Sequence, residues 1–221
     1  AIPPSTVADQ IRAVGTDIGV AAAKTGMLAS AAIIAAVAHA CDDVGIGQSV
    51  PLVVDPVAAS MHGDSLLADD ALDALRAELF PRATLITPNL DEVRLLVGVD
   101  VSSRAEQYTA AKELHSLGSR WVLVKGGHLR EDPQERNPQC LDLLYDGSEF
   151  TAFTSPRLAT PHTHGSGDTL AAAITSALTL GLAMPEAVAY GKRYIEQAVA
   201  HAYPLGSGVG PVSPFWRLQP L

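Results

Sequence analysis

The chain has 221 residues, a length that suits one α/β domain with a sizeable hydrophobic core. Hydrophobic residues make up 48% of it and charged residues 18%, a balance that excludes an intrinsically disordered chain. The formal net charge is −9, so the sequence offers no basic surface of the kind that nucleic acids bind, and we expect no nucleic-acid partner.

The cysteine content and the hydropathy of the sequence indicate the cellular compartment in which the protein works. The two cysteines, Cys41 and Cys140, lie far apart and have no metal-ligand spacing, which favours a reducing cytoplasm over a disulfide scaffold. No signal peptide is recognisable, and the longest apolar stretch, residues 29–40, is too short to span a bilayer. We therefore predict a soluble cytoplasmic protein that has no membrane partner.

In chain order, segments of helical periodicity alternate with short apolar runs of strand length. The predicted elements are a helix over 30–44, a strand over 51–55, a helix over 66–80, a strand over 83–87, a helix over 103–117, a strand over 121–125, a hairpin turning at 145–147, and helices over 168–181 and 185–202. Uniformly apolar strands are typical of parallel strands that are buried on both faces. The pattern predicts an α/β fold with a mostly parallel central sheet flanked by helices, in a single domain over 1–221.

Polar residues follow three of these strands, at the edge where an open α/β sheet binds ligands. Asp55 ends the first strand, Thr87, Asn89 and Glu92 follow the second, and Lys125 ends the third before two glycines. Each has an ordinary interpretation: a turn or cap residue, a first-turn helix acid, or a solvated strand end. Together they suit phosphoryl transfer, which uses a magnesium ion held by carboxylates, a cation on the phosphates and a base for the attacking hydroxyl.

The stretch "HTHGSGDTLAAA", residues 162–173, places Asp168 between a glycine-rich turn and an alanine-rich helix. Asp168 could cap the helix, or it could accept a proton beside an anion that is bound at the helix N-terminus. The residues alone leave both interpretations open. A zinc site at His162 and His164 is disfavoured, because no further ligand at zinc spacing accompanies them.

Eight segments in order resemble one family: "AAKTGMLAS", "VVDPVAASMHGDSLL", "ATLITPNLDEVRLL", "WVLVKGGHL", "DLLYDG", "THGSGDTLAAAI", "GKRYIEQAV" and "GSGVGPVSP". Their order and spacing are similar to those of the hydroxymethylpyrimidine (phosphate) kinases of thiamine biosynthesis, in the ribokinase-like superfamily. The resemblance covers nearly the whole chain and implies a three-layer fold. It also implies ATP-dependent phosphorylation of 4-amino-5-hydroxymethyl-2-methylpyrimidine and then of its monophosphate. ATP, Mg²⁺ and the small pyrimidine are the implied partners, and a homodimer is left open.

The resemblance also implies roles for individual residues. Gly165, Ser166 and Gly167 would form the anion hole for the transferring phosphate, and Asp168 would be the base for the substrate hydroxyl. Asp55 and Glu92 would hold magnesium. The residues expected at the nucleotide are Lys125, Asn89, Thr169, Lys192, Gly206 and Gly208. Lys24 and Met27 match a motif beside the cleft, with no contacts assigned.

The sequence departs from the family pattern at two points. Many of these kinases carry Cys where this chain has Asp168, whereas sugar and pyridoxal kinases of the superfamily carry Asp. The family also begins with a strand and a Gly/Ser-rich loop that helps to build the pyrimidine pocket, and nothing here matches it. We therefore expect the family's N-terminal strand or strands to be missing from this chain. The alternatives are a pyridoxal/pyridoxine kinase of the same fold and a catalytically silent ligand-binding module.

Overall fold

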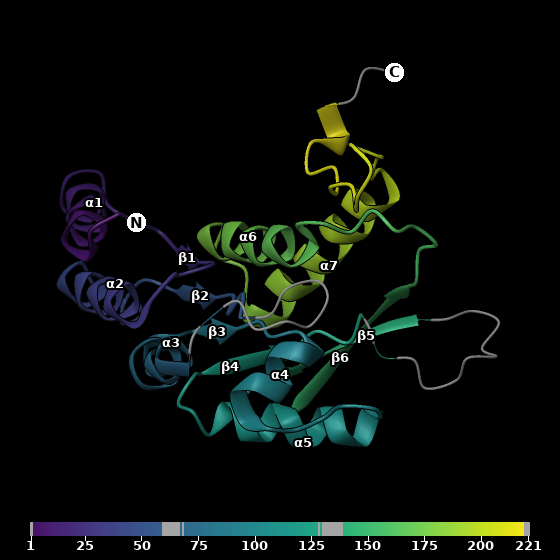
Figure 1. The fold of residues 1–221 in the computed structure, drawn as a ribbon, viewed down its shortest axis with the longest axis horizontal. Coiled ribbons are helices and arrows are strands. Elements are labelled where there is room, and N and C mark those ends of the chain that lie inside the picture. The colour runs from purple at the N-terminus through teal and green to yellow at the C-terminus, as the bar shows by residue number, and fades with distance from the viewer. Residues whose placement is uncertain (1, 59–66, 68, 128, 130–138, 219–221) are drawn as a thin grey trace.

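A computed structural model describes residues 2–58, 67, 69–127, 129 and 139–218. Its centre is one six-stranded sheet with the strand order β1-β2-β3-β4-β5-β6 (Figure 1). The strands are β1 (Ala23–Thr25), β2 (Leu52–Val54), β3 (Leu85–Ile86), β4 (Trp121–Val124), β5 (Gln139–Tyr145) and β6 (Phe150–Pro156). The first four are parallel, and β5 and β6 form an antiparallel hairpin that continues the sheet from β4. The mostly parallel sheet and the hairpin are confirmed.

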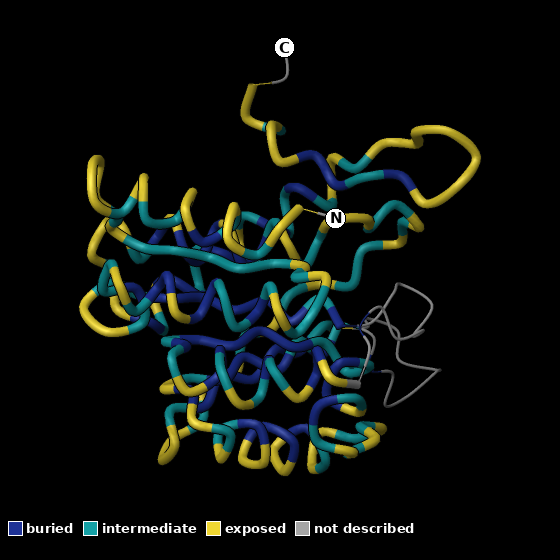
Figure 2. The backbone as a smooth tube through the Cα atoms, turned by 60° about the vertical axis from the view of Figure 1, so that its left-hand side comes forward, coloured by how far each residue is buried: buried dark blue, intermediate teal, exposed yellow. Residues whose placement is uncertain are grey.

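Helices lie on both faces of the sheet. They are α1 (Pro4–Asp17), α2 (Ala31–Asp43), α3 (Asp69–Ala74), α4 (Leu90–Val97), α5 (Arg104–His115), α6 (Ser166–Thr179) and α7 (Met184–Ala200). Strand residues alternate between two hydrophobic clusters: Leu52 and Val54 pack with α2 to α5, whereas Val53 packs with α6 and α7. In Figure 2 the buried strands run between helices whose outer turns are exposed. This double burial explains why the strand sequences are uniformly apolar.

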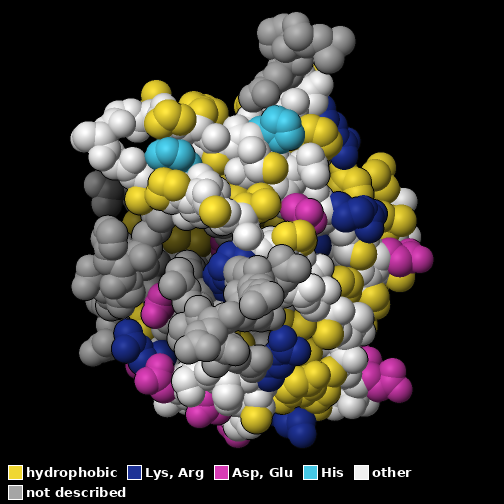
Figure 3. Space-filling model, turned by 90° about the vertical axis from the view of Figure 1, so that its right-hand side faces the viewer, with side chains coloured by type: hydrophobic (Ala, Val, Ile, Leu, Met, Phe, Trp, Pro, Cys, Tyr) yellow, Lys and Arg dark blue, Asp and Glu magenta, His cyan; other side chains and the backbone are white. Residues whose placement is uncertain are grey.

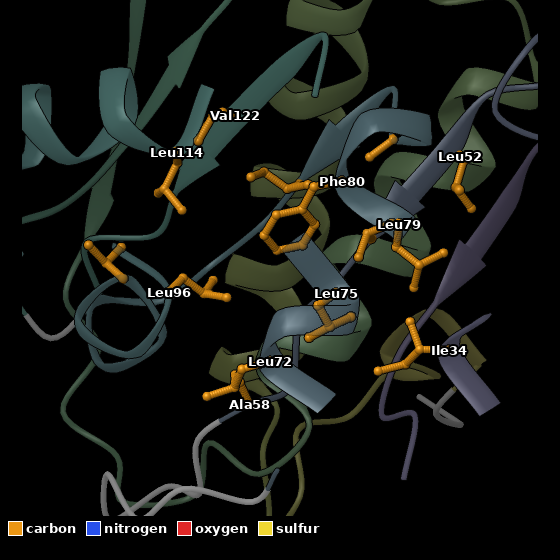
Figure 4. Packing of buried hydrophobic residues seen from close by; sticks show 14 of the residues in the cluster. Ile34, Leu52, Ala58, Leu72, Leu75, Leu79, Phe80, Leu96, Leu114 and Val122 are labelled. Atoms are coloured by element: carbon orange, nitrogen blue, oxygen red, sulfur yellow. The ribbon is translucent and has the colours of Figure 1, made fainter. Parts of the chain in front are cut away.

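The larger cluster is built around Phe80, whose side chain is fully buried. Figure 4 shows its ring among Leu79, Leu96 and Leu114, which come from three different segments of the chain. Burying an aromatic side chain of this size stabilises a core by roughly 2–3 kcal/mol. The helical periodicity of residues 66–80 is thus the pattern of a core-forming segment.

Three features differ from the sequence prediction. The helix expected over 66–80 is α-helical only to Ala74, and then becomes a π-helix over Leu75–Leu79 and a 3-10 turn over Phe80–Arg82. Pro81, which lacks a backbone N–H, lies where the regular helix can no longer continue. Residues 66 and 68 of that prediction lie outside the described residues. The prediction also did not include α1, β1 and α4 as elements.

The amphipathic helix α1 begins with Pro at its first turn and packs on α2 through Val7 and Ile11. Across the described part of the chain, no helix combines the length and the apolar character needed to cross a membrane.

Candidate active site

The carboxyl ends of β2, β3 and β4 bring Asp55, Thr87 and Lys125 together. Lys125 Nζ lies 3.0 Å from Asp55 Oδ1, and Thr87 Oγ1 donates to the same oxygen at 3.2 Å. Asp55 is only 3% exposed, so its charge requires this compensation. The arrangement confirms that the ends of successive parallel strands converge at one edge of the sheet.

The second carboxylate, Glu92, lies in the first turn of α4 and is 2% exposed. Its two oxygens accept hydrogen bonds from the backbone N–H groups of Asn89, at 2.7 Å, and Ala58, at 3.2 Å. Asn89 completes a capping box, because its side chain accepts from the N–H of Glu92 at 2.9 Å. The side-chain oxygen of Asn89 therefore caps the N-terminus of α4.

Burial and neighbouring charges set the protonation of this cluster. Burial raises the pKa of Glu92 above its ordinary value; Asp55 adds to this rise, and Lys125 opposes it. Burial alone would lower the pKa of Lys125, but the carboxylates of Asp55 and Glu92 outweigh it and the net shift is upward. Lys125 therefore remains a cation at neutral pH.

Val57, between Asp55 and Ala58, adopts φ 44°. A β-branched residue in this left-handed region is strained by an amount on the order of 1–3 kcal/mol. The residue one position on, Ala58, donates its N–H to Glu92. The strained turn thus joins the two carboxylate-bearing segments.

Helix α6 starts beside this cluster. Its N-cap, Gly165, has φ 79° and offers no side-chain acceptor to the first N–H groups of the helix, of which that of Ser166 donates to the carbonyl of Thr163 at 3.1 Å. The helix approaches the strand ends closely: a Cβ at Gly167 would lie 3.0 Å from Lys125 Nζ and 3.7 Å from Asp55 Oδ2. An anion at this helix N-terminus would meet Lys125, the N–H groups and the positive end of the helix dipole together.

Asp168 lies in the first turn of α6 and forms an ion pair with Lys24 of β1. The Asp168 side chain is 66% exposed, whereas that of Lys24 is 18% exposed. Asp168 therefore faces open space at the site, and Thr169 beside it lines a crevice of about 470 Å³ between α6 and α7. Sequence reasoning noted Lys24 but missed its partner, which lies 144 residues away.

The segment before α6 also anchors the glycine-containing stretch 206–210. His162 Nδ1 accepts from the N–H of Gly210 at 2.9 Å, and the N–H of His164 donates to the Gly210 carbonyl at 3.1 Å. These bonds fix the end of the stretch next to the helix start, while Gly206 and Gly208 are exposed. Among the described residues, no group of three or more His, Cys, Asp or Glu side chains has the arrangement of a metal site.

Lys192 of α7 points at Asp142 of β5, with Nζ 2.8 Å from Oδ2. Asp142 also accepts from the N–H of Gly126, the residue after Lys125, at 2.9 Å. Sequence reasoning missed Asp142, since an acidic residue within a strand segment gave no sign of its burial. Figure 3 shows the side of the molecule that lies at the right of Figure 1, where a Lys or Arg side chain lies beside a hollow.

Comparisons with known proteins agree on one group of kinases. Residues 1–213 match the family described as phosphomethylpyrimidine kinase. The hydroxymethylpyrimidine/phosphomethylpyrimidine kinase of Mycobacterium tuberculosis is 58% identical over 218 residues, which cover 99% of this chain and 77% of that protein.

Two solved structures are also similar to this chain. The pyridoxal kinase of Bacillus subtilis, in an ADP complex, has a TM-score of 0.86 at 33% identity, covering 99% of this chain and 79% of that one. The phosphomethylpyrimidine kinase of Clostridium difficile has a TM-score of 0.75 at 33% identity, covering 90% of this chain and 77% of that one.

Proposed function

The chain belongs to the phosphomethylpyrimidine kinase family, and we propose that it transfers the γ-phosphoryl group of ATP to 4-amino-5-hydroxymethyl-2-methylpyrimidine and then to the resulting monophosphate. The observation that carries this proposal is the start of α6. There Asp168 lies one residue from Gly167, whose Cα faces Lys125 and Asp55. A proton acceptor and an anion-binding helix terminus thus adjoin one another.

In the proposed reaction, Asp168 accepts the proton of the substrate hydroxyl as that oxygen attacks phosphorus. The backbone N–H groups of the Gly165–Gly167 turn stabilise the charge that develops on the transferring phosphoryl group. Lys24 holds the Asp168 carboxylate by their ion pair and adds positive charge on the same side.

Lys125 is proposed to bind the phosphates of ATP. The other proposed nucleotide-binding residues, by the family pattern, are Asn89, Thr169, Lys192, Gly206 and Gly208. For Asn89, the hydrogen bond that its side-chain oxygen accepts in the α4 cap leaves the amide N–H₂ as the group available to a ligand. Lys192 forms an ion pair with Asp142, so its ammonium group would contact the nucleotide and that carboxylate at the same time.

The carboxylate pair Asp55 and Glu92 fits a magnesium ion that is held mainly through water and ATP oxygens. Asp55 Oδ2 faces the helix start, and each carboxylate oxygen of Glu92 keeps a lone pair beyond its hydrogen bond. Magnesium typically keeps several waters and takes one or two protein carboxylates. Bound there, the ion would neutralise charge on the β- and γ-phosphates.

Pyridoxal phosphorylation is the second candidate, favoured by Asp168 and by the structural similarity to the Bacillus subtilis pyridoxal kinase. The much higher identity to the Mycobacterium tuberculosis enzyme supports the pyrimidine instead. We also propose a single kinase domain working in the cytoplasm, where the two free thiols would stay reduced.

The test is product formation. The purified protein is incubated with ATP, Mg²⁺ and the hydroxymethylpyrimidine, and phosphorus NMR identifies the products. We expect the monophosphate and then the diphosphate, and no product in EDTA. Full turnover in EDTA would contradict the magnesium site alone, whereas ATP left unconsumed at saturating pyrimidine would contradict the kinase.

A further inference from the structure

Asp142 is a buried acidic residue to which the scheme above gives no role. It is 3% exposed, and its two oxygens have different partners. Oδ1 accepts from the N–H of Gly126 at 2.9 Å, and Oδ2 lies 2.8 Å from Lys192 Nζ. The carboxylate therefore links the turn that follows Lys125 to helix α7.

The position of Asp142 in the sheet explains why this link is needed. The antiparallel ladder between β4 and β5 runs to Val124 and Leu143 and then stops. Lys125 bridges to Asn89 on the other side instead. The Asp142 side chain thus supplies the acceptor for Gly126 N–H just where the backbone ladder ends and Lys125 turns toward Asp55.

The turn over residues 125–127 packs tightly against β5. A Cβ at Gly126 would lie 2.0 Å from the carbonyl oxygen of Leu141, so the backbone passes in direct contact with β5. Where the ladder opens, Gln107 Nε2 donates to the carbonyls of Val124 and Leu141, each at 3.1 Å. Arg157, which follows β6, donates to the carbonyl of Leu129 at 2.7 Å and to that of Gly127.

Charge balance makes Asp142 and Lys192 depend on each other. Their side chains are 5% and 11% exposed, and a buried charge that loses its partner is strongly destabilising. The two oxygens of the Asp142 carboxylate accept from Gly126 and from Lys192 at once.

We propose that Asp142 is a positioning residue for Lys125: its carboxylate, neutralised by Lys192, holds the turn over residues 125–127 so that Lys125 Nζ is aimed at the phosphates of the nucleotide. This inference rests on the proposed function only in taking Lys125 as a phosphate-binding residue. It assigns no contact between Asp142 and the substrates.

A double-mutant cycle tests this role. An Asn side chain has one acceptor oxygen, so after Asp142→Asn the N–H of Gly126 and the ammonium of Lys192 compete for it. Lys192→Met removes that competition and leaves the Asn oxygen to Gly126. The readout is the dissociation constant of the ATP analogue AMP-PCP with Mg²⁺, measured by titration calorimetry, which needs no turnover.

We expect Asp142→Asn to weaken AMP-PCP binding about tenfold when Lys192 is present, the equivalent of one hydrogen bond to a charged group. In the Lys192→Met background the same change should weaken binding by less than about threefold. An equal effect in both backgrounds, or no effect in either, would overturn the proposal. If Asp142→Asn alone does not fold, Asp142→Asn and Asp142→Ala are compared in the Lys192→Met background. About tenfold weaker binding with Ala, which offers the N–H of Gly126 no acceptor, supports the role, and equal affinity overturns it.

The matched control is Asp42→Asn. Asp42 pairs with Arg82, which precedes β3, at 2.7 Å and thus away from the carboxyl ends of the strands, so this change should lower Tm without changing AMP-PCP affinity. Absence of AMP-PCP binding by the unaltered protein would overturn the role of Asp142 and the nucleotide site together. Binding without phosphorylation of the pyrimidine would contradict the proposed function, while the cycle still decides the role of Asp142.

Discussion

Lys24 of the edge strand β1 forms an ion pair with Asp168 at the start of α6, and this contact joins the two sides of the site. Gly26 lies beside the pair: a Cβ there would be 3.1 Å from Lys24 Nζ and 3.6 Å from Asp168 Oδ1. The base proposed for the reaction is therefore held by a cation from another part of the chain.

Asp168→Asn should lower kcat by roughly 10²–10⁴-fold, because the amide keeps the size of the side chain but cannot accept the proton. ATP affinity should stay the same or rise, since a negative charge leaves the anion-binding turn. Steady-state kinetics with ATP and the pyrimidine measure both quantities. Turnover close to that of the unaltered protein would return Asp168 to a helix-terminus role.

Lys24→Met should lower kcat about tenfold, since it removes a cation that orients the base and favours charge development nearby. It should change Tm little, because Asp168 is mostly exposed and exposed pairs contribute little to stability. In an Asp168→Asn background the substitution should have almost no effect on kcat. Independent, multiplicative effects of the two substitutions would show that Lys24 does not act through Asp168.

Glu92→Gln should change the pH dependence of stability. The folded-state pKa of Glu92 is raised, so its contribution to stability is present below the unfolded pKa and is lost as the pH rises through the folded pKa. Relative to the unaltered protein, the Gln variant should therefore gain stability as the pH rises from about 4 to 7. Urea unfolding across this range measures the difference.

Glu106→Gln is the matched control, because Glu106 occupies the same capping-box position in α5 but is only partly buried, whereas Glu92 is fully buried. The hydroxyl and backbone N–H of Ser102, together with Ser103, lower the pKa of Glu106. Its contribution is present above the unfolded pKa and is lost as the pH falls, so this variant should lose relative stability as the pH rises. The same pH trend in both variants would contradict the role of burial at Glu92.

Gly126→Ala should destabilise the protein by about 2 kcal/mol or more, because the added methyl group meets a backbone oxygen that cannot move freely. Gly127→Ala is the control, since a Cβ there meets nothing within 4 Å and the residue has no positive φ. Thermal unfolding of the two variants separates steric contact from a general effect of losing glycine. Equal Tm values would contradict the close approach of the backbone at Gly126 to Leu141 of β5.

The fold could largely be predicted from the sequence because the signals are local. The apolar run before Asp55 and the turn residues at Gly147 each determine their own element. Asp55 and Lys125 could be proposed because parallel strands end at one edge of the sheet, and Asp168 because it follows a glycine-rich turn at a helix start. The pairing of Lys24 with Asp168, and of Asp142 with Lys192, could not be predicted. Each depends on how segments 144 and 50 residues apart meet in space, which no local pattern encodes.

The most direct test of the central claim compares two substrates. For a version of the protein that carries the family's N-terminal strand and Gly/Ser-rich loop, kcat/KM is measured at saturating ATP and Mg²⁺ for 4-amino-5-hydroxymethyl-2-methylpyrimidine and for pyridoxal. A pocket that hydrogen-bonds one ring leaves polar groups unpaired against the other, so we expect the pyrimidine to be preferred by more than about tenfold. An equal or larger kcat/KM for pyridoxal would contradict the pyrimidine assignment.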